Sequence, residues 1–252
     1  MIRGMETSAS AMKHLQLKQD IVANNIANSD TVAFKEQLVT AKSVEAMNVR
    51  NRLTHEDVGS INPGIETNTV YENSDKGTIL ETGIDTDFAI LEEAFFKVEI
   101  SDGNYAYTRS GNFHTDMNGK LVTDNGYAVM GKNTVTGNDS YIYVGDESMV
   151  VSSDGTIQNI ENGTIKFNIV EFEDTQSLSR MGKNLYTADG IQEIESQNPS
   201  IKQKALEGSN LDLTTQMVKM IEVSREYSAN QRALKNTDET LQKTVNELGS
   251  LK

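Results

Sequence analysis

The chain contains no cysteine and no tryptophan, and it has only two prolines and three histidines among 252 residues. Without cysteine it forms neither a structural disulfide nor a thiolate metal site. Cysteine usage therefore does not indicate whether the protein works in an oxidising or a reducing compartment. No stretch approaches the roughly 18 apolar residues of a membrane span, and residues 1–20 lack the apolar run of a secretory signal. We therefore expect no direct membrane insertion, and either a cytoplasmic location or export without a cleaved signal peptide.

Sequence patterns of common catalytic and cofactor sites are also missing. The chain has no glycine-rich phosphate loop, dinucleotide fingerprint, nucleophile elbow or zinc-binding helix. Its histidines, His14, His55 and His114, lie in unrelated contexts, so we interpret them as surface residues. Residues 116–119 partly resemble a calcium loop, but the bidentate glutamate of an EF-hand is absent, and a hairpin turn explains them better. We expect no catalytic residue, cofactor or metal.

The net charge of −14 is concentrated in the middle of the chain. Residues 1–35 carry +1 and residues 205–252 carry −1, so residues 36–204 hold the whole excess of acid. An acidic middle does not attract nucleic acid or anionic lipid, whereas nearly neutral ends can approach one another without strong repulsion. Solubility explains the acidity equally well.

Both ends of the chain have the apolar spacing of long amphipathic helices. Toward the C-terminus an apolar residue occupies every seventh position, namely Leu213, Met220, Tyr227, Leu234, Leu241 and Leu248. The second row of that seam is mostly polar and comprises Met217, Ser224, Gln231, Asp238 and Val245. Toward the N-terminus the seam comprises Met5, Ser8, Met12, Leu15, Gln19, Val22 and Ile26.

The C-terminal helix is predicted to begin near Ser209, a cap residue, and Asp212, whose charge favours a helix N-terminus, and to end at Gly249. An amphipathic helix is unstable when its apolar face remains in water. The two ends are therefore predicted to pair as a coiled-coil-like inner domain, or to pack on other molecules. A helical hairpin that closes one domain is the alternative, because periodicity does not identify the partner.

The middle of the chain indicates β-structure. Fifteen of the eighteen glycines and both prolines lie between residues 36 and 204. Phe96, Val98 and Ile100 alternate with polar residues, as in a half-buried strand. Tight turns are predicted at four Asn-Gly or Asp-Gly pairs, at residues 118–119, 125–126, 154–155 and 162–163.

These patterns predict an α+β protein with long terminal helices and a central antiparallel β-rich lobe. Its expected parts are an N-terminal helix at residues 1–35, an extended connector at 36–78, the lobe at 79–190, and a return segment with the C-terminal helix at 191–252.

Four groups of residues resemble a known family, that of bacterial flagellar rod and hook proteins. The N-terminal signature is similar at residues 23–28, Thr31 and Phe34-Lys35. The central domain is similar at residues 87–90, Phe95-Phe96, Val98, Tyr107-Thr108-Arg109, Gly111, Phe113, Asn118-Gly119, Leu121-Val122 and Gly126. The C-terminal signature is similar at Gly182, residues 184–186, residues 203–212, Met217-Val218 and Ile221. The family usually has glycine where this chain has Ala33, Glu92 and Ala94, so backbone geometry is expected to differ there.

The resemblance implies a structural subunit of the flagellar basal-body rod and not an enzyme. Such a subunit would be exported by the flagellar type III apparatus and polymerise with itself and with other rod and hook subunits into a helical tube that transmits torque from motor to hook. Repetition of one heterologous contact produces such an open filament. Distal and proximal rod subunits are not distinguished by these residues.

The resemblance also implies an assembly interface along the two helices. Its asparagines would cap or cross-link the turn that follows the first helix, although asparagine is also tolerated at an ordinary helix C-terminus. The expected interface residues are Met5, Met12, Leu15, Val22, Asn24, Asn25, Ile26, Asn28, Leu213, Met217, Met220, Tyr227, Leu234, Leu241, Val245 and Leu248.

Two other functions remain open from the residues alone. A soluble enzyme would need a pocket with convergent titratable groups in the β-rich lobe. A secreted β-rich binding module would use an exposed aromatic patch, for which Tyr105, Tyr107, Tyr127, Tyr141 and Tyr143 are candidates.

Overall fold

The computed structural model describes residues 2–50, 57–101, 103–144, 149–158, 164–182, 184–196 and 199–249. The described residues divide into two compact units. Unit 1 takes its residues from 1–27, 37–73 and 212–252, and unit 2 takes its residues from 28–36 and 74–211. Helices lie in unit 1 and a large antiparallel sheet lies in unit 2, which confirms the α+β class. His55 and the Asn162-Gly163 pair lie outside the described residues.

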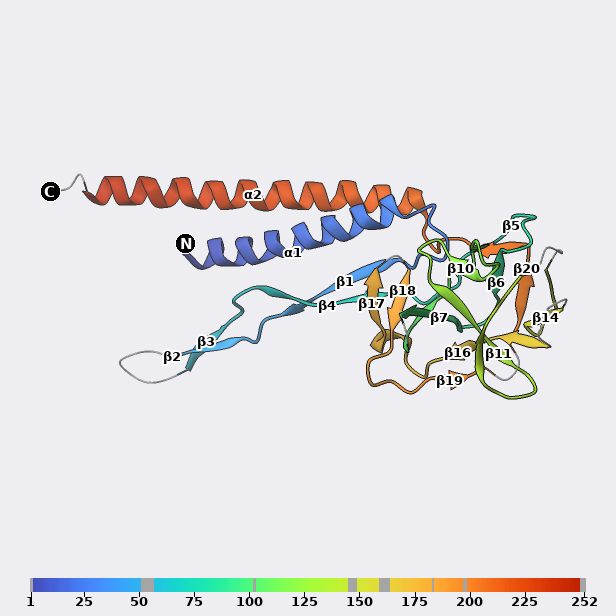
Figure 1. Ribbon diagram of the computed structural model, residues 1–252. Helices are drawn as coiled ribbons and strands as arrows, with labels where there is room; N and C mark the ends of the chain where they lie inside the picture. Colours follow the sequence, from blue (N-terminus) through green and yellow to red (C-terminus); the bar gives the residue numbers. More distant parts are fainter. Residues whose placement is uncertain are drawn as a thin grey trace. The chain divides into compact units, whose positions relative to one another are not determined.

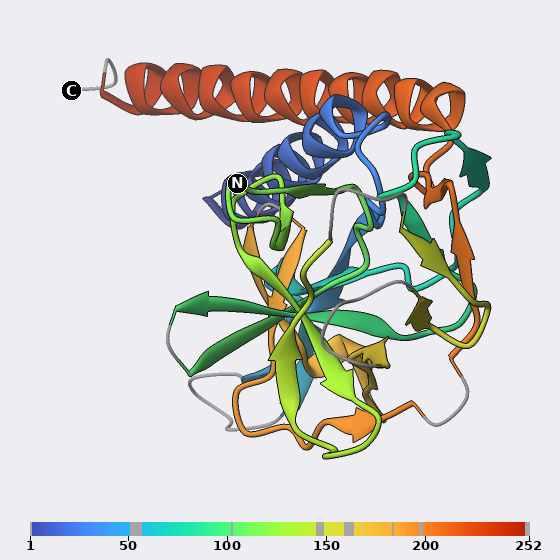
Figure 2. The ribbon, with the colours of Figure 1, turned by 45° about the vertical axis from the view of Figure 1, so that its right-hand side comes forward.

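Two long helices dominate unit 1. They are α1 (Ile2–Ala27) and α2 (Leu213–Gly249), which run antiparallel and contact each other (Figure 1). Figure 2 shows α2, in orange to red, as one uninterrupted helix. It begins where expected, but its cap is Asp212 and not Ser209, because the Asp212 carboxylate accepts the N–H groups of Thr214 and Thr215 at 3.1 and 3.2 Å.

The segment that we expected as an extended connector forms two antiparallel strand pairs in unit 1. The strands are β1 (Gln37–Ser43), β2 (Met47–Arg50), β3 (Asp57–Ile61) and β4 (Ile65–Glu72). β1 pairs with β4 and β2 pairs with β3, and the two pairs follow one another as a narrow ribbon (Figure 1). The ribbon contacts α1, where the side chains of His14 and Thr67 are hydrogen-bonded at 3.4 Å. Two strands alone are marginally stable, so this contact supports the ribbon.

Unit 2 consists mainly of short strands joined by tight turns. Its elements are β5 (Ile79–Glu81), β6 (Phe88–Ile90), β7 (Phe95–Ser101), β8 (Asn104–Thr108), β9 (Phe113–Thr115), β10 (Leu121–Thr123), β11 (Ala128–Asn133), β12 (Asp139–Tyr141), β13 (Val150–Val151), β14 (Thr156–Gln158), β15 (Ile165–Phe167), β16 (Ile169–Glu171), the 3₁₀ helix η1 (Thr175–Ser177), β17 (Ser179–Gly182), β18 (Leu185–Thr187), β19 (Ile194–Glu195), β20 (Ile201–Gln203) and β21 (Ala205–Glu207).

The strand ladders of unit 2 are antiparallel. The main sheet has the order β13-β14-β15-β11-β7-β8-β18-β17, with β9, β10, β12, β16 and β19 attached beside this path. β20 pairs with β6 and β21 pairs with β5, so unit 2 extends beyond the lobe that we expected at residues 79–190. The predicted turns at residues 118–119, 125–126 and 154–155 connect β9 to β10, β10 to β11 and β13 to β14. Gly119 and Gly126 adopt φ values of 77° and 80°, which glycine reaches without strain.

The core of unit 2 lies on both faces of β7. Phe96 and Val98 belong to the larger apolar cluster, in which the ring of Phe96 contacts the rings of Phe113 and Phe167. On the opposite face, Phe95 packs in a smaller cluster of Tyr107, Val170, Phe172 and Tyr186.

The pattern of residues 96–100 predicted a half-buried strand, but Lys97 is buried as well. Its ammonium is neutralised by Glu193 at 2.9 Å and Asp139 at 3.4 Å, and it lies over the ring of Tyr105. A buried lysine is tolerated at this position because two carboxylates pair with its charge.

Candidate assembly interface

The contact between α1 and α2 involves only part of each predicted seam. Leu15, Val22 and Asn25 of α1 are buried, together with Ile21, which the heptad pattern did not include. On α2 the buried residues are Gln216 and Val223, while Met220, Tyr227, Leu234 and Leu241 are half-buried. Met5, Met12 and Ile26 of α1 are also half-buried. The buried residues of α1 all lie in its C-terminal half, where Asn25 contacts Gln37 of β1.

The second row of the α2 seam differs from the predicted one. The structure places Gln216, Val223, Asn230, Thr237 and Thr244 toward the covered side, three residues after each position of the first row. With these residues on the covered side of α2, Gln231 and Asp238 remain exposed to solvent. Thr237 and Thr244 tolerate the covered side because their hydroxyls donate to the helix carbonyls of Ala233 and Thr240, at 2.9 and 2.8 Å.

An apolar row of α2 is left exposed as a result. Its members lie within the first three turns of α2 and are between 39% and 53% exposed, namely Leu213, Met217, Val218 and Ile221. Val245, further along the helix, is exposed as well, and the side chain of Leu248 lies outside the described part of the chain. We call Leu213, Met217, Val218 and Ile221 the open face of α2. A row of this kind is typical of a helix that binds another helix.

Asn25 joins the end of α1 to the start of β1. Its side-chain amide donates to the Gln37 carbonyl oxygen at 2.8 Å, and its side-chain oxygen accepts the Gln37 N–H at 3.0 Å. These two hydrogen bonds link the last turn of α1 to the first residue of β1. Asn28 lies in unit 2, where its side chain and carbonyl accept the hydroxyl and N–H of Thr31, whereas Asn24 is exposed.

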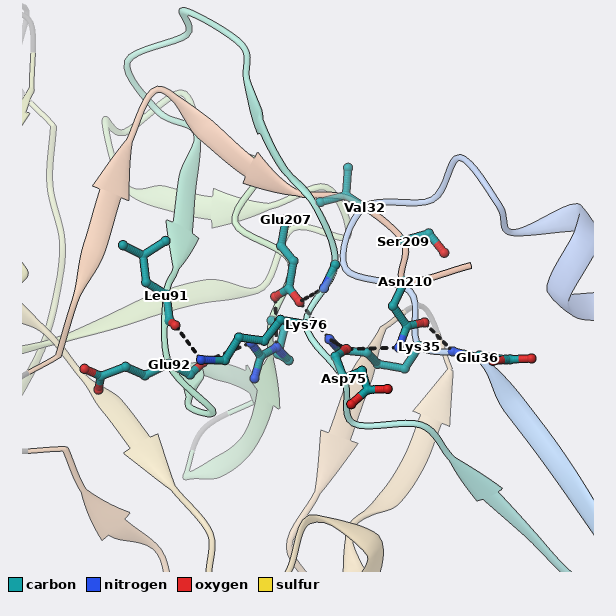
Figure 3. Close-up of polar contacts among 12 residues, drawn as sticks. Val32, Lys35, Glu36, Asp75, Lys76, Leu91, Glu92, Glu207, Ser209 and Asn210 are labelled. Atoms are coloured by element: carbon teal, nitrogen blue, oxygen red, sulfur yellow. Dashed lines mark hydrogen bonds and ion pairs between the residues drawn. The ribbon is translucent and has the colours of Figure 1, made fainter. Parts of the chain in front are cut away.

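A buried charged cluster lies in unit 2. The Glu207 carboxylate accepts the ammonium of Lys35 at 2.7 Å, the guanidinium Nε of Arg109 at 3.0 Å and the N–H of Gly77 at 2.9 Å (Figure 3). None of the three charged side chains is more than 5% exposed. We call Lys35, Arg109 and Glu207 the Glu207 cluster.

Backbone oxygens satisfy the remaining donors around the Glu207 cluster. Lys35 also donates to the Asp75 carbonyl at 2.7 Å, and Arg109 donates to the Glu92 carbonyl at 2.9 Å. Asn210 donates to the same Asp75 carbonyl at 3.0 Å, as Figure 3 shows. With these contacts each buried polar group has a partner, which is the condition for burying charge without a large cost.

The charges of the Glu207 cluster affect one another. Burial alone would raise the pKa of the Glu207 carboxyl, but the charges of Arg109 and Lys35 and the hydrogen bonds from Lys35 and Gly77 outweigh it, so the pKa is held below its usual value. Burial lowers the pKa of the Lys35 ammonium and the charge of Arg109 lowers it further, and together they outweigh the attraction of Glu207. Glu207 is therefore the member on which both cations depend.

The three substitutions of family glycines have different outcomes. Ala33 adopts φ = 54°, a left-handed conformation that costs a residue with a side chain about 1–2 kcal/mol. It is nevertheless buried, and its N–H donates to the Glu207 carbonyl oxygen at 2.7 Å. Among described residues other than glycine, positive φ values occur only at Ala33, Asn184 and Lys204, so Glu92 and Ala94 avoid this strain.

Unit 2 also contains a polar cavity of about 400 Å³. Its walls carry Thr108, Thr123, Asn125, Arg180 and Asp124 among other residues. Asp124 accepts the amide of Asn112 and is largely exposed. The tyrosines considered above do not form one patch, since Tyr107 is buried while Tyr105 and Tyr143 are exposed. Within the described residues, no cluster of three or more histidines or acids has a metal-binding arrangement, and no helix is long and apolar enough to cross a membrane.

Three segments of the chain match known families. Residues 5–35 match the family described as flagella basal body rod protein, and residues 89–159 match the D1 domain of the flagellar hook protein FlgE/F/G. Residues 202–248 match the C-terminal part of the flagellar basal body rod FlgEFG protein. The Glu207 cluster takes one residue from each matched segment.

Whole-length relatives agree with these matches. The flagellar basal-body rod protein FlgG of Bacillus subtilis is 32% identical over 270 residues, which cover 98% of this chain and 99% of the relative. The FlgG of Borreliella burgdorferi is 32% identical, covering 96% of this chain and 97% of the relative. The flagellar basal-body rod protein FlgF of Caulobacter vibrioides is 31% identical and covers 94% of each.

Proposed function

Because the chain belongs to the flagellar basal-body rod protein family and is a structural subunit of the rod, we propose that it polymerises through its two terminal helices. The polymer would be a helical tube that transmits torque from motor to hook and includes other rod and hook subunits. A soluble enzyme and a secreted binding module, both open from residue patterns alone, are not favoured by these relatives. The rod family also implies a location in the flagellar basal body.

The open face of α2 is the observation that carries this proposal. One side of α2 is covered by α1 within the same chain, yet Leu213, Met217, Val218 and Ile221 remain in solvent. Because these side chains are already about half covered, burying the rest of one in a neighbouring subunit contributes about half of the ~1.5–3 kcal/mol of full burial. A head-to-tail contact repeated along one direction then produces a filament and not a closed ring.

The remaining interface residues extend the proposal along both helices. Met5, Met12, Ile26, Met220, Tyr227, Leu234 and Leu241 are half-buried in the single chain, and Val245 is exposed, so neighbouring subunits would complete their burial. Ser224, Gln231 and Asp238 are exposed polar residues that would contact neighbours or a wet central channel. Export by the flagellar type III apparatus without a cleaved signal peptide also belongs to this proposal.

Substitution on the open face tests the proposal. Ile221→Asp should abolish polymerisation of the purified chain and its incorporation into basal bodies, because a carboxylate would enter an apolar contact between helices. Ala233→Asp adds the same charge at an exposed position about 120° around α2 from Ile221, at about 100° per residue, and serves as the matched control. Sedimentation and electron microscopy measure polymer, and a swimming assay measures incorporation. Normal assembly of the Ile221→Asp variant would contradict the proposed contact.

A further inference from the structure

The two segments that connect unit 2 to the terminal helices are bound to each other inside unit 2. Residues 28–36 follow α1, and residues 208–211 precede α2. The Glu36 N–H donates to the Asn210 side-chain oxygen at 2.8 Å, and the Asn210 N–H donates to the Phe34 carbonyl at 3.3 Å. These contacts set the distance between the points at which the chain leaves unit 2 for each helix.

The Glu207 cluster holds both connecting segments on the body of unit 2. Lys35 belongs to the first connecting segment, Glu207 directly precedes the second, and Arg109 follows β8 of the main sheet. Neither core cluster includes a described residue from 28–36, but Ala33 and Phe34 are buried, and the Asn184 side chain donates to the Val32 carbonyl at 2.7 Å. The ion pairs of the Glu207 cluster add to this support, because one carboxylate links Lys35 of the segment to Arg109 beside the sheet.

We propose that Glu207 is a positioning residue for rod assembly, which fixes the spacing of the two connecting segments by pairing with Lys35 and Arg109. This inference rests on the proposed function, since spacing matters only if α1 and α2 present a joint surface to other subunits. The two helices pack against each other in unit 1, so their adjoining ends must remain close together. If the spacing of the two connecting segments is already fixed in the free subunit, assembly does not have to order them, and the entropic cost of association is smaller.

Charge explains why Glu207 has this role. Among the described residues, Glu207 is the acid that forms ion pairs with both Lys35 and Arg109, so its loss would leave these two buried cations without their shared partner, while Asp75 attracts Lys35 more weakly. Lys35 lies on a short connecting segment outside the helices and strands, so loosening of this segment would let its ammonium approach water. Arg109 follows a strand of the main sheet and cannot move in the same way. Loss of Glu207 should thus release residues 28–36 while the sheet stays folded.

The test compares Glu207→Gln with two control variants in the full-length chain. Val129→Ala removes two methyl groups from a fully buried core residue on β11, away from the connecting segments, and supplies a variant of reduced stability. Glu81→Gln neutralises the carboxylate of the exposed Lys202–Glu81 pair and controls for the amide substitution itself. The measurements are polymer yield by sedimentation, fold stability by urea unfolding, and hydrogen exchange resolved by segment.

In the Glu207→Gln variant, amides of residues 33–36 and 208–210 should exchange faster by about tenfold or more beyond any change at strands β7, β8 and β11, whose exchange follows the global stability. Its polymer yield should fall by about tenfold or more at a concentration where wild type assembles. Val129→Ala and Glu81→Gln should assemble as wild type does. If Val129→Ala loses assembly to the same extent at equal stability, Glu207 acts only through stability and the inference is wrong.

A second variant covers the case in which Glu207→Gln does not fold. Lys35→Met keeps the Arg109–Glu207 pair and removes only the link to the first connecting segment. It should fold, exchange faster at residues 33–36 and assemble less well than wild type. Unchanged exchange and assembly in this variant would overturn the inference. Failure of wild type itself to polymerise would instead contradict the proposed function, so the two failures are distinguishable.

Discussion

Lys35 and Glu207 are separated by 172 residues in sequence, yet their charged atoms lie 2.7 Å apart. Neither side chain is more than 5% exposed, and Arg109 shares the same carboxylate. The cluster thus contains two cations and one anion. Its members are therefore unequal in their effect on stability.

We expect the carboxylate to matter more than either cation. Glu207→Gln removes the carboxylate that the two buried cations share and should lower the free energy of unfolding by about 3–5 kcal/mol. Lys35→Met leaves a balanced Arg109–Glu207 pair and should cost only about 1 kcal/mol, the typical net value of a hydrogen-bonded contact. Urea unfolding of both variants measures the difference. An equal or larger loss for Lys35→Met would contradict this account of the charges.

Acid should remove the contribution of Glu207. The folded-state pKa of this carboxyl lies below its usual value of 4.5, so the folded state favours the ionised form. Its stabilisation is fully present above pH 4.5 and declines as the pH falls toward and through the lowered folded-state pKa. The difference in free energy of unfolding between wild type and Glu207→Gln should therefore shrink on acidification. A difference that is constant down to acidic pH would show that Glu207 does not titrate as described.

Replacing Ala33 by glycine should stabilise the protein. Ala33 has φ = 54°, where glycine avoids the strain of a side chain, and we expect a gain of about 0.5–1 kcal/mol. Ala94→Gly is the matched control, since Ala94 is buried, lacks a positive φ and also stands where the family usually has glycine. That change should lose about 0.5–1 kcal/mol because glycine gains freedom in the unfolded chain. Thermal unfolding of both variants tests whether they shift in opposite directions.

A charge in the helix seam should prevent assembly without unfolding unit 2. Leu234→Asp and Leu241→Asp each place a carboxylate at a half-buried position of α2, at a cost of several kcal/mol if a neighbour covers it. Cells that carry either variant should not swim, although the strands of unit 2 keep their hydrogen-exchange protection. Normal swimming would show that the first row of the seam is not an assembly surface.

Single carboxylates of unit 2 should be dispensable for motility. Asp116 and Asp154 accept backbone N–H groups in exposed turns, where solvent weakens contacts of a carboxylate. We expect alanine substitutions to leave swimming near normal when made one at a time at Asp116, Asp124, Asp154, Glu171 and Glu173. A variant that folds and assembles but does not swim would return attention to a catalytic role.

The helices were predictable because their signals are local. The spacing of apolar residues, the acid at position 212 and the glycine at 249 predicted α2, which runs from Leu213 to Gly249. The ribbon of β1 to β4 escaped prediction because its exposed faces show no regular alternation and its pairing joins distant residues, such as Gln37 and Glu72. Strand pairing of this kind depends on register, which a local pattern does not contain.

The Glu207 cluster escaped prediction for a related reason. Lys35, Arg109 and Glu207 each stood within a motif that resembled the rod family, but nothing in their spacing indicated that they meet. Charged residues are normally exposed, so sequence alone favours a surface position for each of them. Each of the three residues lies in a different segment that matches the rod and hook families. That pattern is compatible with a shared structural role, but it does not identify the ion pairs between Lys35, Arg109 and Glu207.

The link between Asn25 and Gln37 would be weakened by deamidation of Asn25. The Asn25 amide acts as a donor to one backbone group and an acceptor to the other, a combination that no carboxylate can reproduce when ionised. Hydrolysis of this amide to aspartate would direct an oxygen at the Gln37 carbonyl, where a hydrogen bond now exists. The burial of Asn25, which is 1% exposed, keeps water away from the one amide on which both hydrogen bonds to Gln37 depend.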